Sequence, residues 1–233
     1  MCPRHGSNRL VPTALLPFVL VIGGLCVATL VILGLLVAHA PQPNWLDTAV
    51  ANMLRPGAFA GSSHLGFRLG MSAQLGGPVP ATFLTALGCY CCLAVRRYRG
   101  AVLLATSVAT ASGLTEYLLK PHLNGNFPSG HATAAFALAA ACCVLLIDPP
   151  DTRMPASMRA VLAALTLGTA CVVALGLVAD HFHNFTDTIG GAATGIAITL
   201  IVALVIDWAA GRRDRVAFNA LPADSSAINN RAP

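Results

Sequence analysis

Long apolar runs alternate with short polar segments along most of the chain. Six runs are nearly free of charged residues: 11–38, 76–95, 100–119, 131–147, 159–180 and 188–209. A run of roughly 18 or more apolar residues is typical of a membrane-spanning helix, because about 20 residues of α-helix rise about 30 Å, the thickness of the hydrocarbon core. The pattern therefore predicts an all-α polytopic membrane protein, a bundle of six transmembrane helices.

The remaining segments divide the chain into three regions. Residues 1–10 and 210–233 are polar and are expected to form an N-terminal tail and a disordered C-terminal tail around the membrane domain 11–209. The first run is longer than the apolar core of about 7–15 residues in a signal peptide, so we interpret it as a retained anchor. Within the domain, Asn44 can cap an amphipathic helix over 44–56, which we expect at the membrane interface with Trp45 as an anchor.

Composition and charge agree with this topology. The chain is 56% hydrophobic and 10% charged, whereas soluble domains carry about 25% charged residues. Most arginines fall before run one, between runs two and three, between runs four and five, and after run six; only Arg55, Arg68 and Lys120 fall on the other side. By the positive-inside rule we expect both termini to be cytoplasmic and the segments 116–131 and 180–187 to face the periplasm or exterior. The net charge of +5 is then a topology signal, and no nucleic-acid partner is expected.

The first candidate for chemistry is the segment "NFPSGHATAAF", residues 126–136. Pro128 and Gly130 interrupt the chain before an apolar run, and Ser129 can act as the N-cap of the helix that follows. The free N–H groups at such a helix end, with Gly130 and His131 in its first turn, favour an anion. The alternative is an ordinary turn into a helix with an interfacial histidine.

The second candidate is "HFHNFTDTIGG", residues 181–191. His183 and Asp187 are four residues apart, so on one helix the carboxylate can hold one ring nitrogen and leave the other free as a base or nucleophile. His181 has Phe185 at the equivalent position and lacks such a partner. The alternative is an interfacial His–Asp pair without a chemical role.

The single lysine of the chain, against 13 arginines, lies beside these segments. Lys120 can bind phosphate, or it can pair with Glu116 four residues earlier and serve as a structural anchor. Together the segments offer a helix-end anion site, two histidines, a carboxylate and a lysine. This set fits phosphoryl transfer through a phosphohistidine, with one imidazole attacking phosphorus and the other protonating the leaving oxygen. No HExxH or paired-Asp motif is present, and we expect no metal and no other cofactor.

"FPSGH" followed by "HNFTDTIGG" resembles the type 2 phosphatidic acid phosphatase superfamily, the lipid phosphate phosphatases, over residues from about 45 to 209. The resemblance implies that His183 is the nucleophile, Asp187 its orienting partner and His131 the general acid. It also implies that Ser129 and Gly130 bind phosphate.

The chain departs from the family pattern at three basic positions. In the first motif, Lys120-Pro121 stands where the family has Arg-Pro, and Gly113 stands where it has lysine. In the third motif, Leu177 replaces the arginine, preceded by Gly176 in place of serine. His122, which follows the Lys-Pro pair, is a candidate for compensating phosphate binding.

These features predict an integral membrane phosphatase, a metal-independent phosphoric monoester or diphosphate hydrolase with an outward-facing active site. The expected substrate is a lipid phosphate or polyprenyl (di)phosphate at the outer face of the cytoplasmic membrane, and the expected partners are membrane lipids. The abundance of arginine over lysine suggests a GC-rich bacterial genome and a substrate of cell-envelope synthesis. One alternative is a weak or inactive relative that binds lipid headgroups or a protein. Another is a small transporter, although transporters usually bind substrate near the midplane and show repeats.

Overall fold

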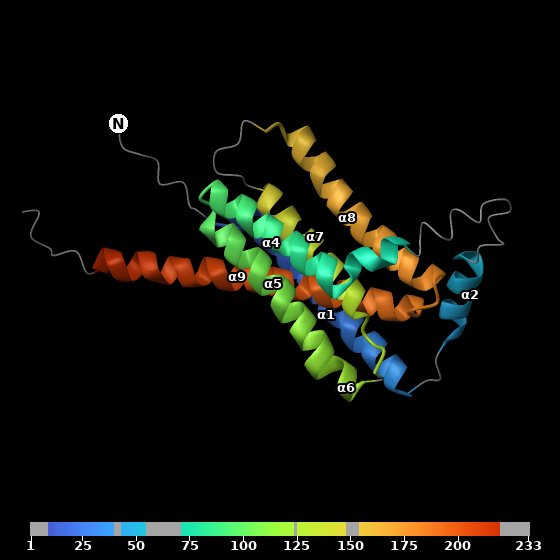
Figure 1. Ribbon diagram of the computed structural model, residues 1–233. Helices are drawn as coiled ribbons and strands as arrows, with labels where there is room; N and C mark the ends of the chain where they lie inside the picture. Colours follow the sequence, from blue (N-terminus) through green and yellow to red (C-terminus); the bar gives the residue numbers. More distant parts are fainter. Residues whose placement is uncertain (1–8, 40–42, 55–70, 124, 148–153, 220–233) are drawn as a thin grey trace, which may run out of the picture.

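The structure is a computed structural model that describes residues 9–39, 43–54, 71–123, 125–147 and 154–219. Every regular element within these residues is helical (Figure 1). The helices are α1 (Leu16–His39), α2 (Trp45–Leu54), α4 (Pro78–Ala94), α5 (Tyr98–Leu114), α6 (Lys120–His122), α7 (Gly130–Ile147), α8 (Ala156–Ala179) and α9 (Phe185–Asn219). Short 3-10 turns, η1 (Thr13–Leu15) and η2 (Gln74–Gly76), precede α1 and α4, and a π-helical segment, η3 (Thr115–Leu119), joins α5 to α6.

Five stretches are long and apolar enough to cross a membrane. They are Thr13–His39, Tyr98–His122, Gly130–Ile147, Ala156–Ala179 and Phe185–Arg213. The remaining expected span corresponds to α4, an apolar helix of 17 residues, which rises about 25 Å at 1.5 Å per residue. The fold is therefore that of an all-helical membrane protein, and the count of six spans stays a prediction.

The helix α2 begins one residue after Asn44, as the amphipathic segment predicts. Asn44 Oδ1 accepts hydrogen bonds of 2.9 Å from the backbone N–H groups of both Leu46 and Asp47. Trp45 and Met53 are exposed, whereas Asp47 is the buried residue of this helix. Residues 55 and 56 of the expected helix, and most of both tails, lie outside the described residues.

The centre of the bundle is the crossing of α7 and α9 (Figure 1). Small residues dominate the contact, including the alanines along α7 and a G-x-x-x-G pattern at Gly191 and Gly195 of α9. A Cβ atom at Gly195 would lie 2.5 Å from the carbonyl oxygen of Thr133 and 2.7 Å from the backbone nitrogen of Ala137. Within a membrane, where hydrophobic driving force between helices is weak, such close backbone approach supplies the packing energy.

The outer helices present apolar side chains away from the protein. Phe18, Leu25 and Leu35 of α1 and Leu165 of α8 are exposed. In water an exposed apolar surface of this extent would be unfavourable, but in a bilayer it is solvated by lipid tails. The outward-facing residues therefore support a membrane environment for the bundle.

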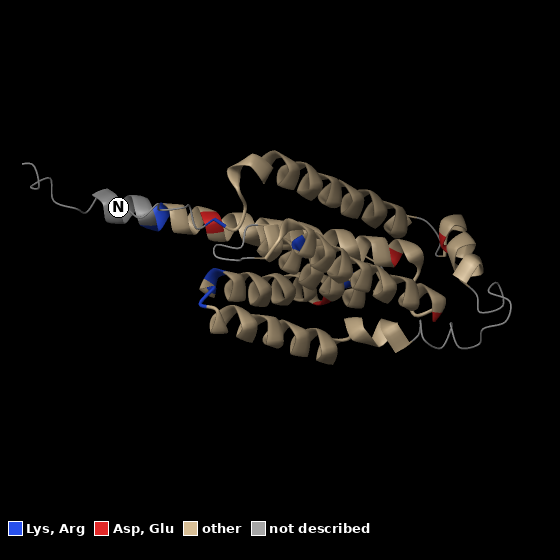
Figure 2. Ribbon diagram, turned by 90° about the horizontal axis from the view of Figure 1, so that it is seen from above, with Lys and Arg blue, Asp and Glu red and all other residues tan. Residues whose placement is uncertain are grey.

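The two ends of the bundle differ in charge. At one end, Asp207 of α9 accepts hydrogen bonds from the backbone N–H groups of Leu10 (2.8 Å) and Val11 (2.9 Å), and Arg99 lies 4.0 Å from the same carboxylate. Arginines gather at this end, where α4 joins α5 and where α9 extends beyond the other helices (Figure 2). The opposite end carries Lys120 and the segments that sequence analysis singled out for chemistry.

Candidate active site

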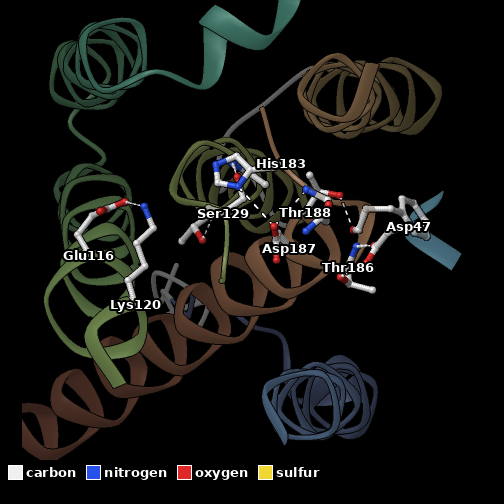
Figure 3. Close-up of polar contacts among 12 residues, drawn as sticks. Asp47, Glu116, Lys120, Ser129, His183, Thr186, Asp187 and Thr188 are labelled. Carbon is white, nitrogen blue, oxygen red and sulfur yellow. Dashed lines mark hydrogen bonds and ion pairs between the residues drawn. The ribbon is translucent and has the colours of Figure 1, made fainter. Parts of the chain in front are cut away.

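His183 and Asp187 lie at the start of α9. The prediction that both are on one helix is wrong, because α9 begins at Phe185 and His183 lies in the bend before it. They are close all the same. The backbone carbonyl oxygen of Asn184 accepts the Thr188 N–H at 3.2 Å, and the Asp187 carboxylate turns back to accept the Asn184 N–H at 3.1 Å. This capping brings Asp187 Oδ2 to 3.7 Å from His183 Nδ1 (Figure 3).

His183 and Asp187 are close to each other but do not form a hydrogen bond. At 3.7 Å the two atoms are beyond hydrogen-bond distance, and His183 Nδ1 has no hydrogen-bond partner among the described residues. The Asp187 side chain is 3% exposed and that of His183 is 10% exposed. A small rotation of the imidazole would close the contact, and catalytic hydrogen bonds often tighten only when substrate binds.

The start of α7 is tied to the start of α9 through the backbone. The Ser129 N–H donates to the Asp187 carbonyl oxygen at 3.0 Å. Ser129 also caps α7, as predicted, since its Oγ accepts the Ala132 N–H at 3.4 Å. None of the hydrogen bonds among the described residues uses the N–H groups of Gly130 and His131, so they remain as donors for an anion at the helix end.

His131 and His183 flank an aromatic ring. The ring centroid of Phe182 lies 6.2 Å from that of His131 and 6.3 Å from that of His183. The His131 ring also approaches the turn before α4, where a Cβ at Gly77 would lie 3.6 Å from His131 Nε2. The two histidines, predicted from separate segments, therefore come together at one mouth of the bundle.

Lys120 forms an ion pair with Glu116, its Nζ lying 2.6 Å from Glu116 Oε1 (Figure 3). Glu116 belongs to the π-helical segment η3, a type of irregularity that is frequent at functional sites. The pair also lies against the start of α7, because the Glu116 carboxylate occupies the space that a side chain at Gly130 would need. The structural pairing predicted for Lys120 is thus present, and it is located beside Gly130 at the N-terminal end of α7.

These groups surround a cavity of about 850 Å³. Its polar end is formed by Glu116, Lys120, His131, His183 and Asn126. From there it continues as an apolar groove between α4 and α5, lined by small and apolar residues that include Ala81, Ala86, Cys89, Ala105, Val108 and Ala109. Because the lining of α4 extends from Pro78 to Cys89 at 1.5 Å per residue, the groove is about 16 Å long.

Two residues predicted to bind phosphate do not line this cavity. The Ser129 side chain is fully buried and serves the cap of α7. His122 is exposed, with Nδ1 at 2.7 Å from the Leu118 carbonyl oxygen. The two arginines expected on the same side, Arg55 and Arg68, lie outside the described residues. Lys120 is the only Lys or Arg among the described residues of the cavity wall.

Two positions where the resemblance implies basic residues are apolar or open in the structure. Leu177 is 1% exposed and packs with Ala73, Ala132 and Val173 in a small apolar cluster. Gly113 faces open space, with no atom within 4 Å of a Cβ built there. The apolar cluster around Leu177 shows that the missing guanidinium is replaced by packing and not by another charge.

Sequence analysis did not single out Asp47. This residue of α2 is 2% exposed, and its carboxylate accepts the Thr186 N–H at 2.9 Å and the Thr186 hydroxyl at 3.2 Å (Figure 3). A signal was present in the sequence, because Asn44-Trp-Leu-Asp47 repeats the pattern of Asn184-Phe-Thr-Asp187.

Among the described residues no group of three or more His, Cys, Asp or Glu side chains is arranged to hold a metal ion. Comparisons with individual curated proteins and with solved structures found no significant match. The family model described as the PAP2 superfamily matches residues 12–210, which include every helix that forms the cavity. The chain belongs to the PAP2 superfamily.

Proposed function

We propose that the protein is an integral membrane phosphatase that hydrolyses a lipid phosphate or a polyprenyl (di)phosphate through a phosphohistidine intermediate. One observation carries this proposal: the two histidines lie at the polar end of a cavity whose remainder is an apolar groove between α4 and α5. A phosphate at the histidines and a lipid tail in the groove would fill both parts, and a soluble phosphate ester would leave the groove empty.

The proposed reaction has two steps. His183 attacks phosphorus with Nε2 while Nδ1–H donates to Asp187, and the bond between phosphorus and the lipid oxygen breaks as His131 protonates that oxygen. Water then attacks the phosphohistidine, His131 takes up the proton, and the P–N bond breaks to release inorganic phosphate. The Gly130 and His131 N–H groups and Lys120 would stabilise the charge on the phosphoryl oxygens.

The sidedness of the reaction is also a proposal. The charge difference between the two ends of the bundle supports a cytoplasmic location for the arginine-rich end and for both termini. The active site would then open at the outer face of the cytoplasmic membrane, where envelope lipids that carry phosphate or diphosphate are processed.

Phosphate release from purified protein in detergent micelles tests the proposal. The substrate panel contains phosphatidate, phosphatidylglycerol phosphate, polyprenyl phosphate and polyprenyl diphosphate. We expect His183→Asn to reduce release to the background rate and to abolish an acid-labile phosphoprotein. The matched control is His181→Asn, because His181 is exposed, lies two residues away and has a positive φ of 55°, which asparagine tolerates.

Equal release by the parent and by His183→Asn would contradict the proposal. That result would favour a family member that binds lipid headgroups or a partner protein without hydrolysis. The observation in favour of this second function is the apolar cluster at Leu177, which leaves Lys120 as the only Lys or Arg described in the cavity wall.

A further inference from the structure

The first turns of α2 and α9 share one capping hydrogen bond. In "NWLD", residues 44–47, the Asp47 carboxylate accepts the Asn44 N–H at 3.1 Å, and in "NFTD", residues 184–187, the Asp187 carboxylate accepts the Asn184 N–H at 3.1 Å. Each asparagine precedes the first helical residue and each aspartate is the third helical residue; at Asn44 the side chain also accepts the Asp47 N–H, which completes a capping box. Asp187 faces His183, so the second of these turns carries the proposed catalytic pair.

Asp47 connects the two turns. Besides the Asn44 N–H, its carboxylate accepts two hydrogen bonds from Thr186, a residue 139 positions later in the sequence, at 2.9 Å from N–H and 3.2 Å from Oγ1. Asp47 and Thr186 are 2% and 3% exposed, so water does not replace these contacts. A buried carboxylate with three donors at a helix N-terminus is favourable, because charge-assisted hydrogen bonds are strong and the helix dipole favours negative charge there.

The contact fixes the backbone that carries Asp187. Thr186 immediately precedes Asp187, and the Asp187 carbonyl oxygen is held from the other side by the Ser129 N–H at 3.0 Å. The first turn of α9 is thus clamped between α2 and the start of α7 (Figure 3). Loss of Asp47 would leave the Thr186 N–H buried without a partner and would release one side of this clamp.

We propose that Asp47 is a positioning residue of the active site. It does not line the cavity and does not touch the reacting atoms. It holds the first turn of α9 so that Asp187 can take the Nδ1–H of His183 and leave Nε2 free for attack. The inference rests on the proposed function, and it adds to the three motifs of the family a residue from α2, the helix expected at the membrane interface.

The experiment compares Asp47→Ala with Asp207→Ala as a matched control. Asp207 also accepts two backbone N–H groups, those of Leu10 and Val11, but at the opposite end of α9. We expect Asp47→Ala to lower kcat on the order of 10–100-fold with KM nearly unchanged, the factor that corresponds to the loss of a hydrogen bond to a charged group. Asp207→Ala is expected to lower the unfolding temperature similarly and to keep kcat.

A double-mutant cycle separates positioning from general destabilisation. If Asp47 acts through Asp187, the double variant Asp47→Ala/Asp187→Ala is no slower than Asp187→Ala alone. Two effects that multiply, or a parental kcat in Asp47→Ala, would overturn the proposal. If Asp47→Ala does not fold, Thr186→Val removes only the hydroxyl contact and is expected to lower kcat by a smaller factor in the same direction, and a parental kcat would then overturn the proposal.

A readout independent of turnover keeps this inference distinct from the proposed function. Nitrogen NMR of labelled histidine in the full-length protein, assigned with His183→Asn, reports which ring nitrogen of His183 carries the proton. We expect one tautomer in the parent and a mixture in Asp47→Ala. If the parent hydrolyses no substrate, the proposed function fails while the tautomer result still decides the role of Asp47. An active parent whose Asp47→Ala variant keeps the tautomer and kcat would refute only the positioning role.

Discussion

The ion pair of Lys120 and Glu116 allows the sharpest test of whether this site binds phosphate. Lys120 Nζ lies 2.6 Å from Glu116 Oε1, and both residues line the cavity. If Lys120 serves only as the partner of Glu116, Lys120→Ala removes an (i, i+4) pair in which Glu116 is 46% exposed. Such pairs stabilise a protein by about 0.3–0.5 kcal/mol, and kcat/KM would then stay unchanged.

A role in phosphate binding predicts a much larger effect on activity than on stability. A hydrogen bond to a charged group contributes about 1.5–3 kcal/mol, and about 1.4 kcal/mol corresponds to a factor of ten. We therefore expect Lys120→Ala to lower kcat/KM roughly 10–150-fold while lowering the free energy of unfolding by only about 0.5 kcal/mol. Lys120→Arg, which restores the residue of the family motif, is expected to keep or raise kcat/KM, because a guanidinium can bind phosphate with two parallel hydrogen bonds.

Glu116→Gln is the matched control because it keeps the shape of the side chain and removes its charge. It releases Lys120 for the phosphate and removes a negative charge from the cavity, so we expect kcat/KM to stay equal or rise. The assay is steady-state phosphate release over a range of substrate concentrations, with thermal unfolding measured on the same samples. A parental kcat/KM in Lys120→Ala, or equal losses in Lys120→Ala and Glu116→Gln, would refute the reasoning.

Three further outcomes are expected. Loss of the proposed general acid in His131→Ala should lower kcat by roughly 10²–10⁴-fold, and a parental rate would remove His131 from the mechanism. Ala109→Phe narrows the apolar groove, so KM should rise for long-chain lipid phosphates and stay constant for a short water-soluble ester; equal effects on both would argue against a tail in the groove. Gly195→Ala places a Cβ 2.5 Å from the Thr133 carbonyl oxygen, so thermal unfolding should show a loss of about 1–3 kcal/mol, and unchanged stability would contradict the close helix crossing.

The dependence on metal gives one more prediction. The proposed reaction uses only protein side chains and water, so phosphate release should persist after incubation with a strong chelator. Inhibition that added divalent metal reverses would contradict a metal-independent mechanism.

Local features of the site were predictable because they depend on neighbours in the sequence. The apolar runs indicate helices, Asn44 and Ser129 cap helices as their residue types favour, and Asp187 approaches His183 across four residues. The prediction that His183 lies on the helix of Asp187 was wrong for a local reason. The spacing of four suggested one shared helix, but the asparagine that follows His183 starts the helix later, and the aspartate reaches back through its cap.

Which of Lys120 and His122 faces the cavity could not be predicted from neighbouring residues in the sequence. They are two residues apart and both were candidates for phosphate binding, yet Lys120 lines the cavity while His122 is exposed beside the Leu118 carbonyl oxygen. Residues i and i+2 of a helix lie about 200° apart around its axis, so the two side chains cannot both face the cavity, and the π-helical segment before them shifts the rotation that decides which one does. The sequence contains no periodic signal for that change.

Hydropathy, capping and spacing are local properties of the chain, so they were enough to predict the helical class, the membrane character and the candidate site residues. The tertiary structure decided which of those groups share a cavity, that Leu177 is part of an apolar cluster, and that Asp47 holds the turn of Asp187. These contacts join residues far apart in the sequence, and they follow from how closely small residues such as Gly191 and Gly195 let the helices pack. Packing depends on the volumes of all helices at once, so no single segment encodes it.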